Sequence, residues 1–297
     1  MPAADNSVID RFEELNVWHR SDVRAPHKPL LVMYALARFS RGEFSPLRFE
    51  DLVTDLTALL REFGPSRKSY HPEYPFWRLQ NDRLWVVESD APMSARSSNT
   101  DAKKSELIAK HATGRFSDDV AEELRTNPLL ITRIARRLLE EHFAESLHDD
   151  ILSAVGLSLA QAVSRSRRDP RFREKILVAY ERRCAVCHLD LRLGSTTVAI
   201  EAAHIKWHQA GGPDVEPNGL ALCSVHHKIF DLGAMTIDAQ SRILVSEHAT
   251  GSDGFESVLL RYHGQPARAP LRSEHRPGSK FLAWHRREVF KEEARDA

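Results

Sequence analysis

The chain has 297 residues, long enough for two domains, and its 42% hydrophobic and 28% charged residues are typical of a globular protein that buries a core. The longest apolar run, residues 30–37, is far shorter than the roughly 18 residues that a membrane helix needs, and the first residues have no basic start or apolar stretch, so we expect a cytoplasmic protein without a secretory signal. The 42 Lys and Arg residues equal the 42 Asp and Glu residues, so the total charge neither favours nor excludes nucleic acid.

The first part of the chain predicts three helices. Ser7 can cap a short helix over residues 8–16, and Pro26 and Pro29 can open a second helix that continues through residues 30–39. This second segment is apolar nearly all round, so we expect it in the core. A third helix is predicted where apolar side chains recur at helical spacing ahead of a C-terminal glycine, at Leu52, Val53, Leu56, Leu59, Leu60 and Phe63, followed by Gly64.

A β-hairpin is predicted next. The β-prone runs 76–80 and 83–87 flank a two-residue turn, Asn81-Asp82. Three helices followed by a hairpin indicate a winged-helix-like domain that reads DNA.

The middle of the chain predicts a loop, further helices and a linker. Residues 90–104 are polar and turn-rich, and long loops in compact domains often carry function. Residues 118–156 are predicted to be helical, with one helix starting at Asn127-Pro128. Residues 164–183 contain 8 basic and 3 acidic side chains, a local excess that can neutralise phosphates. We therefore predict an α+β protein with domains over residues 1–158 and 172–297, joined by a linker over residues 159–171.

All three cysteines lie near one another in the sequence and predict a metal site. Cys184 and Cys187 form one pair with two residues between them, and Cys223 and His226 form a second. Such a set suits tetrahedral structural zinc, and an odd number of cysteines in a reducing compartment disfavours a disulfide framework. His226 repeats the spacing of the first pair, which makes it our choice of fourth ligand; the alternatives are His188 and His227.

Three polar residues inside this zinc frame suit phosphodiester hydrolysis. A histidine at the end of a strand, as predicted for His204, can deprotonate water near neutral pH. A histidine on a helix, as predicted for His227, can hold a divalent cation against the scissile phosphate. An asparagine, here Asn218, can tie the intervening loop across a hairpin without titrating.

The motifs around these residues resemble the core of HNH (ββα-metal) endonucleases. The resemblance covers residues 176–240 and is carried by E-A-A-H-I at 201–205, N-G-L-A-L-C at 218–223 and H-H-x-x-F-D-x-G at 226–233. Phe281 to Phe290 also resembles the closing helix of such domains. The resemblance implies that His204 is the general base, Asn218 the residue that orders the loop, and His227 the ligand of a catalytic divalent metal, such as Mg²⁺.

One position departs from that pattern. Many HNH endonucleases have a metal-binding acid or histidine directly before the base, where this chain has Ala203. The catalytic metal would then have one firm protein ligand, or would take a second from Glu201 or Asp231.

Residues 8–87 resemble the sulfur-binding domain of phosphorothioate-dependent restriction endonucleases, which are type IV, modification-dependent enzymes. R-x-P-H-K-P at 24–29 and Y-P-F-W at 74–77 carry the resemblance, together with the order of the domains. In that family, the sulfur-binding domain precedes an HNH nuclease that cleaves double-stranded DNA whose backbone carries a non-bridging sulfur. The resemblance therefore implies phosphorothioate-modified DNA as the partner of this chain.

Recognition of sulfur requires an apolar contact that a phosphate oxygen would not tolerate. An oxygen is strongly hydrated, so placing it in an apolar cup costs free energy, whereas a larger and more polarisable sulfur gains dispersion contacts there. We expect Tyr74 and Pro75, supported by Phe76 or Trp77, to form the rim of such a cup. The predicted cations on the remaining oxygens are Arg20, Arg24, His27 and Lys28, and the predicted contacts to base edges come from Arg96, Ser98, Asn99 and Lys103.

Two other functions remain open from the sequence. The enzyme could depend on a different modification, such as methylcytosine, read in an aromatic pocket to which Trp18, Trp77 and Trp85 could contribute. Because of Ala203, the chain could also be a zinc-stabilised DNA-binding adapter that does not cleave. If it does cleave both strands, a single HNH site requires two protomers or two events, so a homodimer is one expectation.

Overall fold

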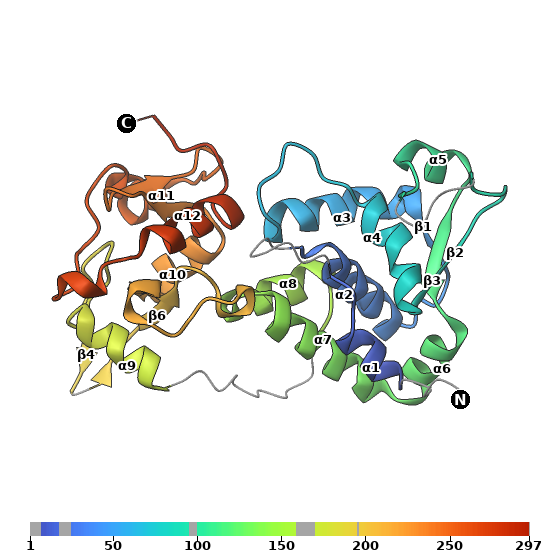
Figure 1. Ribbon diagram of the computed structural model, residues 1–297, viewed down its shortest axis with the longest axis horizontal. Helices are drawn as coiled ribbons and strands as arrows, with labels where there is room; N and C mark the ends of the chain where they lie inside the picture. The colour runs from blue at the N-terminus through green and yellow to red at the C-terminus, as the bar shows by residue number, and fades with distance from the viewer. Residues whose placement is uncertain (1–6, 18–24, 95–99, 159–169, 195, 297) are drawn as a thin grey trace. The chain divides into compact units, whose positions relative to one another are not determined.

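The chain forms two compact units in the computed structural model, which describes residues 7–17, 25–94, 100–158, 170–194 and 196–296. The N-terminal unit holds the described residues up to 142 together with 148–158, and the C-terminal unit holds 143–147 and the described residues from 170 onward (Figure 1). Residues 143–147 thus group with the C-terminal unit although they precede the predicted linker. Within the described ranges, no helix is long and apolar enough to cross a bilayer.

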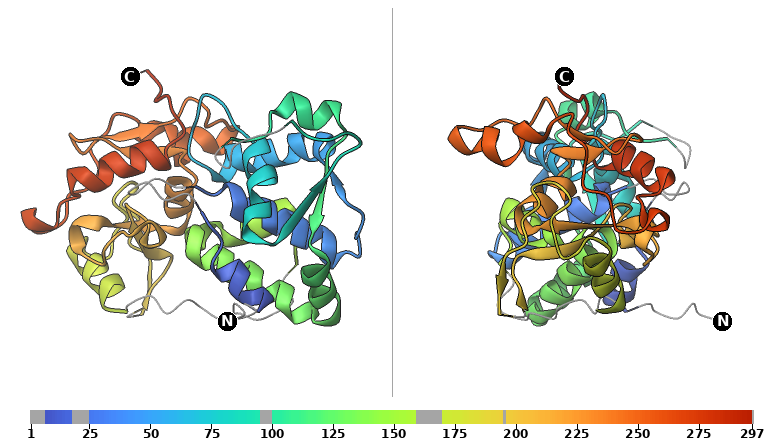
Figure 2. Two further views of the ribbon diagram at one scale, coloured as in Figure 1. Left: turned by 45° about the vertical axis from the view of Figure 1, so that its right-hand side comes forward. Right: turned by 90° about the vertical axis from the view of Figure 1, so that its left-hand side faces the viewer.

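A buried helix, α2 (His27–Ser40), forms the centre of the N-terminal unit. Nine of its 14 residues are buried, which confirms the expectation from its apolar sequence. It begins earlier than predicted, because Pro29 is tolerated in a first helical turn, where its missing N–H has no helical partner to lose. Figure 2 shows α2 among the helices that it contacts, α3 (Phe49–Phe63), α4 (Glu73–Arg78), α7 (Pro128–His142) and α8 (His148–Val155).

The ends of the first and third helices follow from their capping residues. The Ser7 hydroxyl accepts the backbone N–H of Asp10 (3.4 Å), and the Asp10 carboxylate accepts the N–H of Ser7 (3.2 Å), so α1 (Val8–Glu13) starts with a capping box. It stops short of the predicted end at residue 16. α3 forms as predicted, and the N–H of Gly64 donates to Leu60 O (3.0 Å) at its end.

The predicted hairpin over residues 76–87 is wrong. Its first half is helical, in α4 and η1 (Leu79–Asp82), because Phe76 and Leu79 are both fully buried at helical spacing and this packing overrides β propensity. Its second half, β2 (Trp85–Glu88), pairs with β3 (Thr113–Phe116), and β3 also pairs with β1 (Leu47–Arg48). The result is an antiparallel sheet of order β1-β3-β2. The winged-helix-like architecture, for which the hairpin was the main argument, stays a prediction.

The rest of the N-terminal unit agrees with the sequence more closely. The described residues 90–94 and 100–103 have no helix or strand, as predicted, and α5 (Lys104–Ala109) follows them. The predicted helical stretch contains α6 (Asp118–Thr126), then α7 starting at Pro128, then α8.

A strand–strand–helix arrangement positions the residues of interest in the C-terminal unit. β6 (Ile200–His204) and β7 (Gly219–Cys223) form an antiparallel ribbon, and α10 (Ser224–Asp231) follows β7 directly. The register pairs Ile200 with Cys223 at one end and His204 with Gly219 at the other. A Cβ on Gly219 would lie 2.2 Å from Ile176 Cδ1, so this glycine lets α9 (Pro170–Ala179) approach the ribbon closely.

The remaining elements complete an α+β unit around a core that collects apolar side chains from α9, the ribbon, α10 and the last helix. That helix, α12 (Ser279–Glu288), covers most of the segment predicted to close the domain. The others are η2 (Glu145–Leu147), β4 (Arg192–Leu193), β5 (Thr196–Thr197), η3 (His208–Ala210), η4 (Glu216–Asn218), β8 (Met235–Ile237), β9 (Ile243–Val245), α11 (Asp253–Val258), η5 (Leu260–Tyr262) and η6 (Ser273–His275).

Candidate functional site

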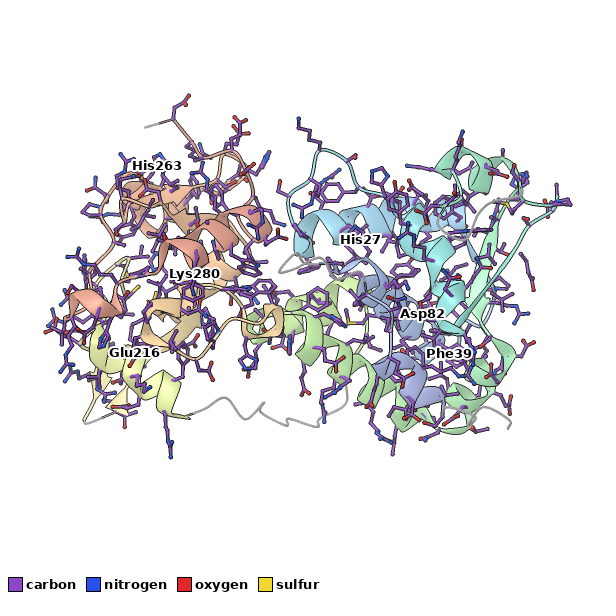
Figure 3. All side chains as sticks on the ribbon, in the orientation of Figure 1. His27, Phe39, Asp82, Glu216, His263 and Lys280 are labelled. Atoms are coloured by element: carbon purple, nitrogen blue, oxygen red, sulfur yellow. The ribbon has the colours of Figure 1, made fainter. Side chains whose placement is uncertain are left out.

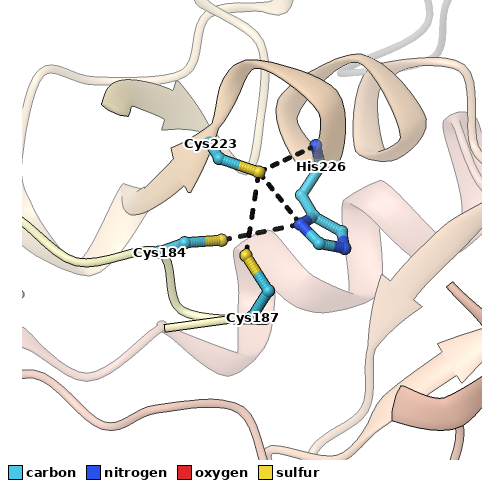
Figure 4. A group of neighbouring side chains, drawn as sticks. All are labelled: Cys184, Cys187, Cys223 and His226. Carbon is cyan, nitrogen blue, oxygen red and sulfur yellow. Dashed lines mark hydrogen bonds between the residues drawn. The ribbon is translucent and has the colours of Figure 1, made fainter. Parts of the chain in front are cut away.

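Three cysteines and one histidine come together where β7 meets α10 (Figure 4). The ligand atoms of Cys184, Cys187, Cys223 and His226 all lie within 4.8 Å of one another. Cys187 Sγ and Cys223 Sγ are 3.9 Å apart, close to the roughly 3.8 Å edge of a tetrahedron with zinc–sulfur bonds of about 2.3 Å. The set therefore fits a tetrahedral zinc ion. His188 is exposed, and the fourth side chain in the cluster is that of His226.

Neighbouring groups prepare these side chains for a metal. His226 Nε2 lies 2.8 Å from Val258 O, an acceptor, so the ring presents Nδ1 to Cys223 Sγ at 3.0 Å. Hydrogen bonds from Cys187 and Cys223 lower the pKa of the Cys184 thiol, whereas hydrogen bonds from Cys184 and Cys187 raise the pKa of the Cys223 thiol, so the thiolate that a metal binds is favoured at Cys184. The Sγ of Cys223 also accepts the N–H of His226 at the N-terminus of α10, where a negative charge is stabilised.

Asn218 ties together the loop between β6 and β7. Its side chain is fully buried, and its Nδ2 donates to Lys206 O and Pro213 O, both at 3.0 Å. Its Oδ1 accepts the N–H of Lys206 (2.9 Å). These contacts are the ones that a loop-ordering residue needs.

His204 lies at the last pair of the β6–β7 ribbon. Its ring stacks on Phe172 of α9, with centroids 4.1 Å apart and planes 14° apart. Its Nε2 lies 2.7 Å from Asp214 Oδ1, in the loop that Asn218 ties. Asp214 was not predicted as a site residue, because a lone aspartate in a Gly- and Pro-rich loop has no distinguishing motif.

His227 is held between two carboxylates. Its Nδ1 lies 2.6 Å from Glu201 Oε2 and its Nε2 lies 3.2 Å from Asp231 Oδ2. Burial opposes a charge on His227, but Asp231 and Glu201 outweigh this effect and raise its pKa to about 9. A cation that binds this imidazole therefore has to displace a proton.

Asp231 is buried and fully engaged by polar neighbours. Burial alone would raise its pKa, but the adjacent His227 and hydrogen bonds from His227 and Ser146 lower it. Its Oδ1 also accepts from Trp207 Nε1 (3.1 Å). Asp231 therefore stays a carboxylate despite its burial and can serve as a metal ligand.

The two key imidazoles have different partners. Side chains alternate along a strand, so Glu201, which contacts His227, and His204, three residues later, lie on opposite faces of β6. Phe172 of α9 accordingly covers His204, whereas His227 belongs to α10.

In the N-terminal unit, Tyr74 is the exposed member of the predicted cup. Its side chain is 39% exposed, its ring stacks on His71 (4.5 Å, 9°), and the Arg78 guanidinium lies 5.7 Å from the ring centre. Trp77 is half-buried and Pro75 is buried. Phe76, predicted with Trp77 as a possible support of the rim, is fully buried against Phe49 and Trp85, so it cannot contact DNA itself and its supporting role stays a prediction.

His27 lies at the start of α2 in a positive environment. Burial, with the positive groups of Arg67 and His71, lowers its pKa to about 4. In the absence of DNA this direction favours a neutral imidazole, which can still donate a hydrogen bond, and the predicted contact of His27 with DNA stays a prediction. Arg67 and His71 were not predicted from the sequence, although both lie within seven residues before the Y-P-F-W motif.

Lys28, another predicted phosphate-binding cation, forms a largely buried ion pair within the N-terminal unit. Its Nζ donates to Asp82 Oδ2 (2.5 Å) and to Asn16 O (2.7 Å), and the two charged side chains are only 12% and 3% exposed. Figure 3 labels Asp82 together with His27 in this unit. The geometry corrects the expectation that Lys28 binds phosphate, because its charge is already compensated by a buried carboxylate.

We expect Lys28→Met to destabilise the N-terminal unit by about 3 kcal/mol, because it leaves the Asp82 carboxylate buried without its partner. The preference for modified over plain DNA should be unchanged. Denaturant unfolding and gel-shift titration measure the two effects, with Lys104→Met, at an exposed lysine outside the predicted DNA contacts, as the control. A loss of DNA affinity at unaltered stability would instead return Lys28 to the DNA surface.

The described residues of the predicted loop 90–104 are attached to neighbouring helices, one of which carries Tyr74. Arg78 forms a double hydrogen bond with Asp101 (2.5 and 2.6 Å), and Ser94 N donates to Glu106 Oε1 (2.8 Å). Lys103 is exposed. The other predicted DNA contacts, Arg20, Arg24, Arg96, Ser98 and Asn99, and also Trp18, lie outside the described residues.

Two families match the two parts of the chain. The HNH endonuclease family matches residues 184–238, the segment that holds the Cys/His cluster, the ribbon and α10. The chain is therefore a DNA endonuclease of the HNH class. The family described as ScoMcrA-like, DNA sulfur-binding domain, matches residues 5–160, more than half of the chain. The protein belongs to this ScoMcrA-like family, and the predicted membership is confirmed.

Three solved structures of sulfur-binding or phosphorothioation-dependent proteins are similar to this chain. The sulfur binding domain of ScoMcrA complexed with phosphorothioated DNA is 20% identical, with 51% of this chain and 96% of that chain covered and a TM-score of 0.44. The corresponding SprMcrA complex is 21% identical, with 50% and 91% covered and a TM-score of 0.43. The type IV phosphorothioation-dependent restriction endonuclease ScoMcrA is 19% identical (TM-score 0.42); the match covers 60% of this chain and 34% of that longer one. No curated protein matches the chain.

Proposed function

We propose that this endonuclease recognises phosphorothioate-modified double-stranded DNA through its N-terminal unit and hydrolyses phosphodiester bonds near the modification with a divalent metal. The observation that carries the proposal is an exposed aromatic ring, Tyr74, set among basic groups inside a ScoMcrA-like sulfur-binding domain. The similar sulfur binding domains of ScoMcrA and SprMcrA were solved with phosphorothioated DNA.

The proposed cup combines attraction for sulfur with rejection of oxygen. Tyr74 offers an apolar ring face whose position is fixed by its stack on His71. Arg78, near the Tyr74 ring, and Arg67, near His27, are the proposed cations for the remaining phosphate oxygens, although Arg78 shares its charge with Asp101. An unmodified phosphate would lose hydration against the ring without gaining the dispersion contacts of sulfur, so the ring discriminates between the two.

The loop between Ser94 and Asp101 is the proposed reader of bases beside the modification. Its described ends are fixed, one by Glu106 and the other by Arg78 of the helix that carries Tyr74. Contacts from this segment to base edges would add a sequence preference that contacts to phosphate cannot supply.

In the C-terminal unit, the proposed roles follow from contacts of the chain's own residues. His204 accepts a proton from the attacking water, and Asn218 holds the adjoining loop. His227 and Asp231 would hold the divalent cation, and Glu201 orients His227 through Nδ1, so that the missing acid at Ala203 is replaced from α10. The cation supplies charge stabilisation for the phosphate and the leaving oxygen. We further propose that the Cys/His cluster binds structural zinc, which fixes the start of α10.

The proposal predicts that the protein binds DNA with one non-bridging sulfur more tightly than the same DNA with oxygen at that position. Two duplexes that differ by a single non-bridging sulfur should bind with clearly different affinities in a gel-shift titration. Tyr74→Ala should reduce this preference at least about tenfold, or about 1.4 kcal/mol, because it removes the ring face. The matched control is Phe44→Ala, at another exposed aromatic that packs on Phe39 instead of His71.

Other outcomes point to the alternative functions. Equal binding of the two duplexes by the wild-type protein would remove the claim of sulfur recognition. Tighter binding of a methylcytosine duplex would favour a base-modification reader. Selective binding without cleavage in Mg²⁺, Mn²⁺, Co²⁺ or Ni²⁺ would show a DNA-binding adapter.

A further inference from the structure

Asp214 occupies a position in the β6–β7 loop that neither sequence motif includes. Its Oδ1 lies 2.7 Å from Nε2 of His204. A carboxylate is only an acceptor, so this contact places a proton on Nε2 and selects the tautomer with its lone pair on Nδ1.

The loop around Asp214 is built to keep this carboxylate in place. On one side of it, Pro213 O accepts from Asn218 Nδ2 (3.0 Å); on the other, Val215 O accepts the backbone N–H of Asn218 (2.9 Å). The buried Asn218 therefore fixes both residues that flank Asp214. The contact with Pro213 comes from the Asn218 side chain, and the contact with Val215 comes from its backbone.

The imidazole itself is restrained in two independent ways. The stack on Phe172 fixes the plane of the ring, and the contact with Asp214 fixes its rotation within that plane. The His208 ring is also near, 6.1 Å away in an edge-on arrangement. The side chain of Asp214 remains 32% exposed, so its pairing with His204 contributes little to stability and a role in orientation is the better explanation.

We propose that Asp214 is a positioning residue of the nuclease: it orients His204 and holds the tautomer in which Nδ1 takes the proton of the attacking water. This inference rests on the proposed role of His204 as general base. In the step, the water O–H bond breaks, the proton goes to Nδ1 of His204, and the water oxygen forms a bond to phosphorus while the bond from phosphorus to the leaving oxygen breaks. Asp214 accepts the Nε2–H hydrogen bond throughout and takes no proton.

The test compares five versions of the full-length protein in single-turnover cleavage of a bound sulfur-bearing duplex: wild type, Asp214→Asn, Asp214→Glu, Glu216→Gln and His204→Ala. Glu216, labelled in Figure 3, is the matched control, because it is a carboxylate of the same loop that lies 3.8 Å from Lys175. We expect Asp214→Asn to slow cleavage about 10- to 100-fold at unchanged DNA affinity and unchanged melting temperature. Asp214→Glu should recover part of the rate, and Glu216→Gln should cleave like wild type.

A second measurement does not depend on cleavage. Nitrogen NMR of histidine-labelled protein should show His204 protonated on Nε2 in the wild type, and a mixture of tautomers in Asp214→Asn. Wild-type cleavage by Asp214→Asn together with an inactive His204→Ala would overturn the role of Asp214 and leave the proposed function intact. Wild-type cleavage by His204→Ala would overturn the proposed role of His204 as general base, on which this inference rests, whereas absence of cleavage by the wild-type protein would count against the proposed function.

Discussion

His204→Ala should lose at least about 100-fold in the rate of DNA cleavage and keep the affinity of the wild-type protein for a sulfur-bearing duplex. The expected loss is the usual contribution of a positioned general base, and the affinity is kept because the proposed sulfur cup lies in the other unit. Cleavage of end-labelled duplexes with saturating divalent metal measures the rate, and gel-shift titration measures the affinity.

The control for this prediction is His208→Ala. Its ring is exposed and only 6.1 Å from that of His204, but it has no contact with Asp214 among the described ones, so its loss should leave the rate nearly unchanged. His227→Ala should also lose cleavage, and higher metal concentrations should partly restore it, because Asp231 remains as a ligand. If His204→Ala cuts at the wild-type rate, the base is another group and the hydrolytic mechanism proposed above is wrong.

The second large effect concerns the Cys/His cluster. Cys184→Ser should unfold or strongly destabilise the C-terminal unit, by more than about 3 kcal/mol, since structural zinc sites contribute directly to folding. The N-terminal unit should still bind sulfur-bearing DNA, because its core is separate. Metal analysis of the purified protein and thermal unfolding with and without a chelator check both parts.

His188→Ala is the matched control, because His188 directly follows Cys187 but is exposed and outside the cluster. It should bind as much metal as the wild type. A wild-type protein that contains no zinc, and that melts at the same temperature in chelator, would contradict the proposal of a structural metal.

The sequence identified those parts of the fold whose signals are local. The capping box at Ser7, the buried character of α2 and the spacing of the metal ligands depend on residues within a few positions of one another, or on a repeated motif. The hairpin failed because Phe76 and Leu79 are buried by partners that are distant in sequence. Partner residues such as Asp82 for Lys28 and Asp214 for His204 could not be assigned for the same reason.

For the candidate site, the sequence identified which side chains are present more reliably than it identified their burial, charge state and partners. His27 carries the expected ring, but its burial beside Arg67 and His71 favours a neutral imidazole in the absence of DNA. Lys28 carries the expected charge, but a buried aspartate compensates it. A motif states which side chain is present, whereas its charge and availability depend on neighbours that only the folded chain brings near.

The short segment 143–147 has a consequence for building chimeric nucleases. Within the C-terminal unit, the Ser146 hydroxyl donates to Asp231, the Lys228 ammonium donates to the Ser146 carbonyl, and the Phe143 ring is fully buried. Grafting residues 172–297 onto a foreign recognition module would discard all three contributions and leave a buried carboxylate of α10 one donor short. A cassette that carries residues 143–147 with it should transfer a better-preserved cutting site than one trimmed at the predicted linker.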